Sequence, residues 1–177
     1  MKIKLNTQYL KKYIKLYNIT EFLFRELGPK IRKMGYFTFD DFYAICTWKT
    51  RRAKNQYLKN NKNEVERITK LVLAEKSEYQ KMKTLCELRG VSIPVASAML
   101  AVVNPSKYGI IDIRCLEMLA ELGENLPKSL SIKTWEKFLE IIRKIAKENK
   151  ITPREVDMAL FAMHREKLDN IYRNLYL

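Results

Sequence analysis

The sequence contains few of the residues that bind metals or form disulfides. Its 177 residues include three widely spaced cysteines (Cys46, Cys86 and Cys115), no CxxC pair and a single histidine, His164. This excludes a structural zinc site built on CxxC pairs and an iron–sulfur cluster held by four cysteines. One histidine also argues against a His-rich metal site or a Ser-His-Asp apparatus. We therefore expect no metal and no iron–sulfur cluster, with the cysteines packed in the core in a reducing compartment.

Long apolar runs are also absent. No stretch approaches the length of a membrane span, and the first twenty residues carry too many charges for a signal peptide. We expect an intracellular, cytoplasmic protein that does not enter a membrane. A monomer is favoured, although the sequence leaves the oligomeric state open.

Turn formers are scarce, with five glycines and five prolines. Apolar residues recur at helical spacing along most of the chain, and no convincing strand is present. The clearest helix starts are the capping-box patterns at Thr38–Asp41 and Thr152–Glu155. We predict an all-α fold of about eight helices, forming one helical domain over residues 1–177. One helix should end near Gly28-Pro29, and residues 54–63 should form a flexible loop.

The charge is strongly positive. Lysine and arginine number 34 against 20 acidic residues, which gives a net charge of +14 and a pI of about 9.7. Such an excess favours a polyanionic partner, most simply nucleic acid. The alternative is a basic surface with no specific partner.

Residues 78–103 have the pattern of a helix–hairpin–helix. One helix closes at Leu85 and Leu88, a short turn follows, and Pro94 lies in the first turn of the next helix. Such a turn presents free backbone N–H groups at a helix N-terminus, where a phosphate binds favourably. The predicted phosphate-binding residues are Gly90, Val91, Ser92 and Ile93.

A single carboxylate, Asp112, follows the hairpin. The loop 104–112 begins at Asn104-Pro105, passes an apolar pair, and ends where Asp112 opens a new helix. The simplest reading of Asp112 is a helix N-cap, for which Asp is a favoured residue.

These residues together resemble the helix–hairpin–helix DNA glycosylases. This superfamily includes endonuclease III and the adenine, 3-methyladenine and 8-oxoguanine glycosylases. The resemblance covers residues 85–119, and "GIIDIRCLEML" is most similar to the archaeal 8-oxoguanine glycosylases. Gly90 stands 22 positions before Asp112, the spacing that the resemblance implies. The matching residues are Leu88, Gly90-Val91-Ser92, Ala96-Ser97-Ala98 and Ile110-Ile111-Asp112.

The resemblance implies a two-lobed helical enzyme of DNA repair that rotates a damaged or mispaired base out of the duplex. Asp112 would stabilise the cationic sugar and activate water. Ser92 replaces the second hairpin glycine, which puts in doubt a monovalent cation at the hairpin carbonyls. Bifunctional members have a lysine at the position of Pro94. The resemblance therefore implies a monofunctional glycosylase without lysine-dependent lyase activity; Lys49 and Lys107 are other amines, and the spacing favours neither.

Further candidates come from aromatic and basic side chains. Around Trp48 the chain carries Lys49, Arg51 and Arg52, a combination typical of nucleic-acid contacts, and Lys107 is a further candidate DNA contact. The alternative is a solvated basic face. Tyr43 and His164 are candidate pocket residues, whereas we expect Phe42, Phe161 and Trp135 to pack in the core.

The sequence leaves three hypotheses open. The first is a DNA N-glycosylase with Asp112 as its catalytic residue. The second is a non-catalytic helix–hairpin–helix DNA-binding protein in which Asp112 is only a helix cap. A helical regulator or RNA-binding adaptor is a more distant third. The excised base is not specified by the sequence.

Overall fold

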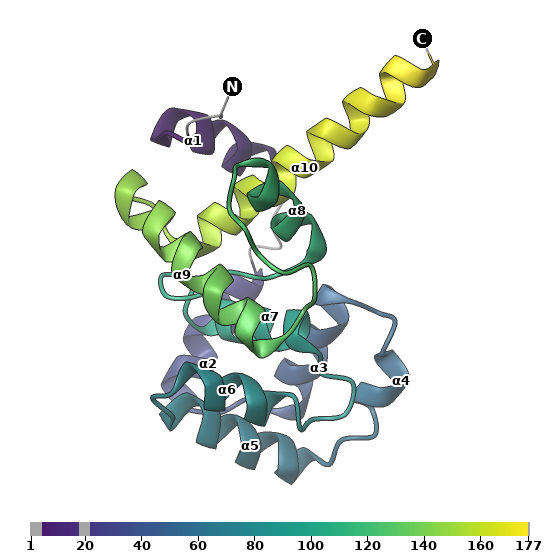
Figure 1. The fold of residues 1–177 in the computed structure, drawn as a ribbon. Coiled ribbons are helices and arrows are strands. Elements are labelled where there is room, and N and C mark those ends of the chain that lie inside the picture. The colour runs from purple at the N-terminus through teal and green to yellow at the C-terminus, as the bar shows by residue number, and fades with distance from the viewer. Residues whose placement is uncertain (1–4, 18–21, 177) are drawn as a thin grey trace.

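The computed structural model describes residues 5–17 and 22–176, and all regular structure in these residues is helical, which confirms the all-α prediction (Figure 1). Ten α-helices and one π-helical segment are present in this part of the chain, against about eight helices expected. In chain order they are α1 (Thr7–Leu16), η1 (Leu23–Leu27), α2 (Gly28–Met34), α3 (Phe39–Lys49), α4 (Lys54–Tyr57), α5 (Lys62–Ala74), α6 (Glu78–Leu85), α7 (Ile93–Val103), α8 (Ile113–Glu121), α9 (Ile132–Asn149) and α10 (Pro153–Tyr176).

The additional elements are α1, α2 and α4. The prediction that a helix ends near Gly28-Pro29 is wrong: Pro29 lies in the first turn of α2, and the π-helical η1 runs directly into it. Proline is compatible with this position because an N–H in the first turn needs no intrahelical partner. The expected loop 54–63 contains α4, which is held by the fully buried Tyr57 packed edge-on to Phe42, with ring centroids 6.0 Å apart.

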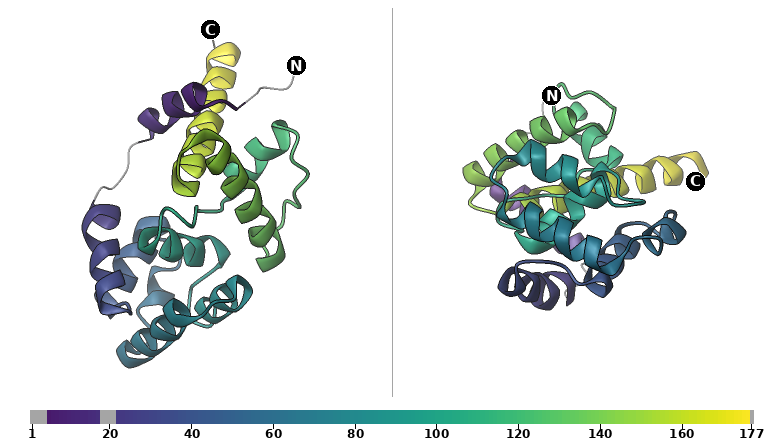
Figure 2. Two further views of the ribbon diagram at one scale, coloured as in Figure 1. Left: turned by 90° about the vertical axis from the view of Figure 1, so that its left-hand side faces the viewer. Right: turned by 90° about the horizontal axis from the view of Figure 1, so that it is seen from below.

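The helices form two groups, seen one above the other in Figure 1 and the left view of Figure 2. In the lower group α7 is the central helix, contacted by η1, α2, α3 and α6, and every residue from Val95 to Val103 is buried. In the upper group α10 is central and packs against α1, α8 and α9. The segment 104–112 and the contact between α6 and α9 connect the two groups.

One connected cluster of buried apolar side chains extends through both groups. It contains Phe42 and Trp135, as the sequence predicts, together with the buried Cys46 and Cys115. Phe161 is different: it is only partly buried, and it lines the cavity described below. In the described part of the chain, none of the helices combines the length and the apolar character that crossing a membrane requires.

Local capping explains where several helices begin. Thr38 and Asp41 form the expected capping box at α3. At α10, Thr152 Oγ1 accepts from the Glu155 N–H, and Glu155 Oε2 accepts from the Thr152 N–H at 2.7 Å. Each box satisfies N–H groups that the first helical turn leaves unpaired. The start of α10 is therefore well defined, and this matters because α10 supplies three residues to the cavity.

Candidate functional site

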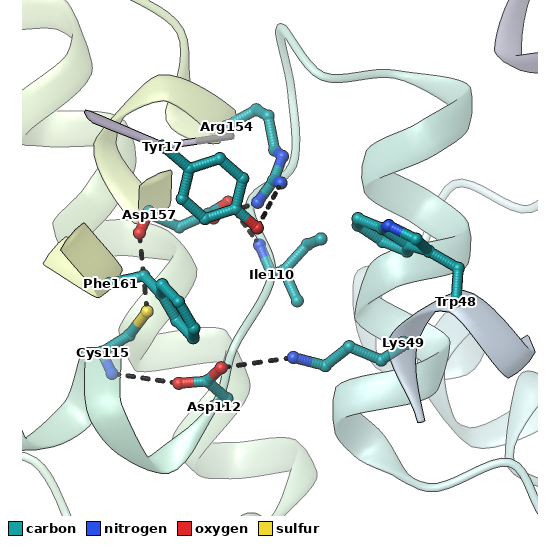
Figure 3. A pocket seen from close by; sticks show the side chains of 9 residues that line it. All are labelled: Tyr17, Trp48, Lys49, Ile110, Asp112, Cys115, Arg154, Asp157 and Phe161. Carbon is teal, nitrogen blue, oxygen red and sulfur yellow. Dashed lines mark hydrogen bonds and ion pairs between the residues drawn. The ribbon is translucent and has the colours of Figure 1, made fainter. Parts of the chain in front are cut away.

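A cavity of about 200 Å³ lies between residues of the two helix groups (Figure 3). Its wall is built from five separate segments: the end of α1, the end of α3, the loop 104–112, the first turn of α8 and the first turns of α10. The lining residues are Tyr17, Trp48, Lys49, Ile110, Asp112, Cys115, Arg154, Asp157 and Phe161. Two of the predicted DNA-binding residues, Trp48 and Lys49, thus meet the predicted catalytic Asp112 in one cavity.

Asp112 is held by its own helix. It is the N-cap of α8, and its Oδ1 accepts hydrogen bonds from the N–H groups of Arg114 at 3.0 Å and Cys115 at 3.2 Å. The helix dipole also favours a negative charge at this position. The other oxygen, Oδ2, lies 3.3 Å from the Lys49 amine and faces the cavity (Figure 3). One oxygen therefore serves the fold and the other is presented to the site.

The loop before Asp112 is fixed by two buried hydrogen bonds. The N–H of Ile110 donates to Asp157 Oδ2 at 2.7 Å, and the N–H of Ile111 donates to Ser97 Oγ at 3.2 Å. Ser97 belongs to α7 and Asp157 to α10, so the central helix of each group holds one end of the Ile110-Ile111 pair. This places the Asp112 carboxylate accurately, because a rigid supporting shell limits its movement.

Lys49 is the last residue of α3 and approaches Asp112 from the other helix group. Its side chain is 16 % exposed and that of Asp112 20 % exposed, so the pair is largely shielded from solvent. Ion pairs are weakened less by salt in such surroundings than on an open surface. The pair joins α3 to α8 across the cavity.

A second ion pair, between Arg154 and Asp157 on α10, also lines the cavity. Both side chains are buried, with 4 % and 3 % exposure. Burial raises the pKa of the Asp157 carboxyl to about 7, against the opposing effects of the Arg154 charge and the Ile110 N–H. Arg154 also donates to the Tyr17 hydroxyl at 3.1 Å. The pair therefore links α10 to the end of α1 and to the loop 104–112.

Aromatic rings make up much of the wall. The Arg154 guanidinium lies 5.0 Å from the ring centroid of Tyr17, 4.9 Å from that of Phe24 and 6.0 Å from that of Trp48. Phe161 packs edge-on to Tyr17 with centroids 5.6 Å apart. In Figure 3, Trp48 lies on the α3 side, and Tyr17 and Phe161 lie across from it. Flat rings on two sides suit a planar ligand.

The expected hairpin residues lie between α6 and α7. Gly90 has a positive φ of 85°, and a Cβ there would lie 2.8 Å from the Tyr57 ring, so glycine is required for both backbone and space. The Asn60 side chain stabilises the turn by two hydrogen bonds: it accepts one from the Arg89 N–H at 2.8 Å and donates one to the Arg89 carbonyl at 3.0 Å. Ser92 is the N-cap of α7, but its side chain makes no capping hydrogen bond.

Two carbonyl oxygens of the hairpin turn already accept hydrogen bonds. That of Leu88 accepts from the Val91 N–H at 3.0 Å, and that of Arg89 accepts from Asn60. Both of these hydrogen bonds come from within the chain. In the described part of the chain, no group of three or more His, Cys, Asp and Glu side chains is arranged to bind a metal ion.

Basic residues lie close to this turn. Arg51 and Arg52 are exposed just beyond α3, and α4 then brings Gln56 and Tyr57 against Gly90. Arg89, within the turn, is also exposed. The helix α4, which follows the predicted basic segment in the chain, therefore contacts the predicted hairpin.

Three predicted site residues lie elsewhere. Tyr43 stacks on Phe39, with centroids 6.3 Å apart, and is not among the cavity-lining residues. His164 Nε2 lies 2.8 Å from Glu117 Oε2, so this side chain is paired outside the cavity. Lys107 pairs with Glu78 at 3.3 Å, also away from the cavity.

Six lining residues were not predicted as site residues: Ile110 and Phe161, which the sequence predicts to be buried, and Tyr17, Cys115, Arg154 and Asp157. Arg154 and Asp157 carried a signal, because two opposite charges three positions apart follow a strong helix start. That spacing is typical of a local ion pair on a helix, whereas the burial of both side chains comes from tertiary packing. Tyr17 and Cys115 carried no signal. Comparison of the chain with models of protein families, with curated proteins and with solved structures finds no match.

Proposed function

We propose that this protein is a DNA N-glycosylase of base excision repair that acts inside the cell, in the cytoplasm. It rotates a damaged or mispaired base out of the duplex into the cavity and hydrolyses the bond between base and sugar. The observation that carries the proposal is the position of Asp112: a shielded carboxylate with one oxygen facing a small aromatic cavity, one loop after a hairpin flanked by basic residues.

The chemistry requires a fixed negative charge. Breaking an N-glycosidic bond leaves positive charge on the sugar, and a preorganised carboxylate stabilises that charge as it develops. Asp112 Oδ2 is suited to this role because Oδ1 is already held by two backbone N–H groups. The same oxygen can orient an attacking water molecule. Pro94 supplies no amine, so water is the nucleophile available at the hairpin.

The size and walls of the cavity support a single base as the ligand. Its volume of about 200 Å³ is below the range of roughly 300–1,000 Å³ that is typical of pockets for drug-sized ligands. A base that leaves the stack needs flat apolar surfaces against which to pack. Tyr17, Trp48 and Phe161 provide such surfaces.

Charge and the hairpin support DNA as the partner. The net charge is +14; Arg89 is exposed within the turn, and Arg51 and Arg52 are exposed just before α4, which contacts Gly90. The N-terminus of α7 has no side-chain cap, which leaves its N–H groups to other acceptors, such as a phosphate. Binding through phosphates should weaken steeply as the salt concentration rises.

The second candidate is a non-catalytic DNA-binding protein. The observation in its favour is that both oxygens of Asp112 already have structural partners, two N–H groups and Lys49. In that case Asp112 connects α8 to α3 and takes no part in a reaction.

The deciding experiment measures free base released from duplexes that each carry one lesion, such as 8-oxoguanine, uracil, an alkylated purine or a mispaired adenine. Asp112→Asn is the test variant because Asn caps a helix about as well as Asp. Asp169→Asn, at an exposed position of α10, is the matched control. We expect release from at least one duplex, lowered about 100- to 1,000-fold in Asp112→Asn and unchanged in the control. No release from any duplex, with equal DNA binding by all three proteins, would favour the binding protein.

A further inference from the structure

The cavity contains an amine beside the carboxylate. Lys49 Nζ lies 3.3 Å from Asp112 Oδ2, although the two residues are 63 positions apart in the chain. A sugar whose cationic carbon is stabilised by Asp112 must lie close to Oδ2. It therefore also lies close to the Lys49 amine.

Lys49 is also the best nucleophile among the cavity residues. Burial raises the pKa of the Cys115 thiol well above its usual range, and this thiol donates to the Asp157 carbonyl, so it stays protonated. The Tyr17 hydroxyl is engaged by Arg154. A lysine amine, by contrast, forms Schiff bases with carbonyl carbons as soon as it loses its proton.

We propose that Lys49 is a second nucleophile of this site and gives the protein a lyase activity that cuts the DNA strand at the sugar from which the base has gone. The chemical class of the substrate is deoxyribose in DNA with an aldehyde-level C1′. The inference rests on the proposed glycosylase function for the way in which the sugar reaches the cavity. The proposed nucleophilic amine belongs to α3, whereas bifunctional glycosylases have theirs at the hairpin position that Pro94 occupies here.

Lys49 and Asp112 together supply and accept every proton that moves in the first step. The Lys49 ammonium gives one proton to the departing base, which takes the electron pair of the C1′–N bond and leaves neutral. The amine lone pair then forms a bond to C1′, and Asp112 accepts the proton that the new secondary ammonium releases. Asp112 returns this proton to O4′ as the C1′–O4′ bond breaks, which leaves an iminium between Lys49 and C1′.

Strand cleavage follows from the iminium. Asp112, again a carboxylate, accepts a proton from C2′, and the 3′ phosphate oxygen leaves with the electron pair of the C3′–O bond. Water then hydrolyses the iminium, which releases the sugar aldehyde and restores the amine. No oxidant, reductant or metal is consumed.

The test uses the full chain and a duplex with one preformed abasic site, so that it does not depend on which base is excised. Borohydride reduces an iminium to a stable covalent adduct. The variants are Lys49→Arg, which keeps a cation opposite Asp112 but stays protonated, and Lys49→Gln, which removes the charge. Lys144→Gln, at an exposed position of α9, is the control.

We expect wild type and Lys144→Gln to form the adduct and to break the strand without alkali, and both Lys49 variants to lose these activities. Peptide mapping should find the reduced sugar on Lys49. Equal trapping by wild type and Lys49→Arg, or an adduct on another amine, overturns the inference.

Base release measured on the lesion duplexes separates the two proposals. Release by wild type without any trapping refutes the lyase and leaves the glycosylase intact. Trapping at Lys49 without release from any lesion refutes the glycosylase and supports the amine assignment.

Discussion

The buried Asp157 carboxylate holds two parts of the candidate site, the Ile110 N–H and the Arg154 guanidinium. The substitution Asp157→Ala removes the acceptor of the Ile110 N–H, which donates at 2.7 Å, and leaves the Arg154 guanidinium, 4 % exposed, without its carboxylate. Removing one partner of a buried ion pair typically costs about 3–5 kcal/mol. An N–H left without an acceptor costs about 1–3 kcal/mol when it is counted alone.

The two costs overlap because both follow from the loss of one side chain. We therefore expect Asp157→Ala to lower the free energy of unfolding by about 4 kcal/mol, a large part of a typical total of about 5–15 kcal/mol. The melting temperature of a chain of this size should fall by roughly 10 °C. The Asp112 loop loses its attachment to α10 at the same time, so base release should fall in parallel.

Urea unfolding followed by far-UV circular dichroism measures the effect, with an unchanged m-value as the sign that the two end states are the same. Asp169→Ala, at an exposed position further along α10, is the matched control and should change stability by less than about 0.5 kcal/mol. A cost for Asp157→Ala below about 1 kcal/mol would refute the reasoning, since it would show that neither Arg154 nor Ile110 depends on this carboxylate.

Three further predictions concern neighbouring features. Because burial raises the pKa of Asp157 from 3.8 to about 7, the folded chain holds a proton that the unfolded chain releases. The stability from this group should therefore be fully present below pH 3.8 and be lost as the pH rises through about 7, and Asp157→Asn should remove this dependence in unfolding curves across that window. Asp112→Ala should cost about 1 kcal/mol and Asp112→Asn only a few tenths, because Asn preserves the helix cap; equal costs in thermal unfolding would contradict the capping role. A Cβ at Gly109 would lie 2.5 Å from Ile142 Cδ1 and 2.8 Å from the Pro153 carbonyl, so Gly109→Ala should cost about 1–3 kcal/mol in urea unfolding, whereas Ser106→Ala, at an exposed position of the same loop, should be nearly neutral.

Much of the helical framework could be predicted from local signals. The capping boxes at Thr38 and Thr152, the helix start at Asp112 and the burial of Phe42 and Trp135 are all confirmed. These features depend on neighbours within about one helical turn or on the spacing of apolar residues along one face, and both are visible in the sequence. Two of the missed helices lacked such signals: α4 has only four residues, and α2 begins at Gly28-Pro29, which is typical of a helix end. The third, α1, was missed although Asn6 caps its first turn.

Which residues come together in the cavity depends on the tertiary structure. Hydrophobic periodicity indicates which face of a helix is buried but not which element covers it, so nothing local relates Lys49 to Asp112 or Tyr17 to Arg154. The predicted pocket residues Tyr43 and His164 lie outside the cavity because their partners Phe39 and Glu117 engage them elsewhere. The sequence by itself determined where α8 begins and that a carboxylate stands there. Only the packing of α3, α8 and α10 decided that this carboxylate faces an amine in a small aromatic cavity, because such contacts join residues far apart in the chain.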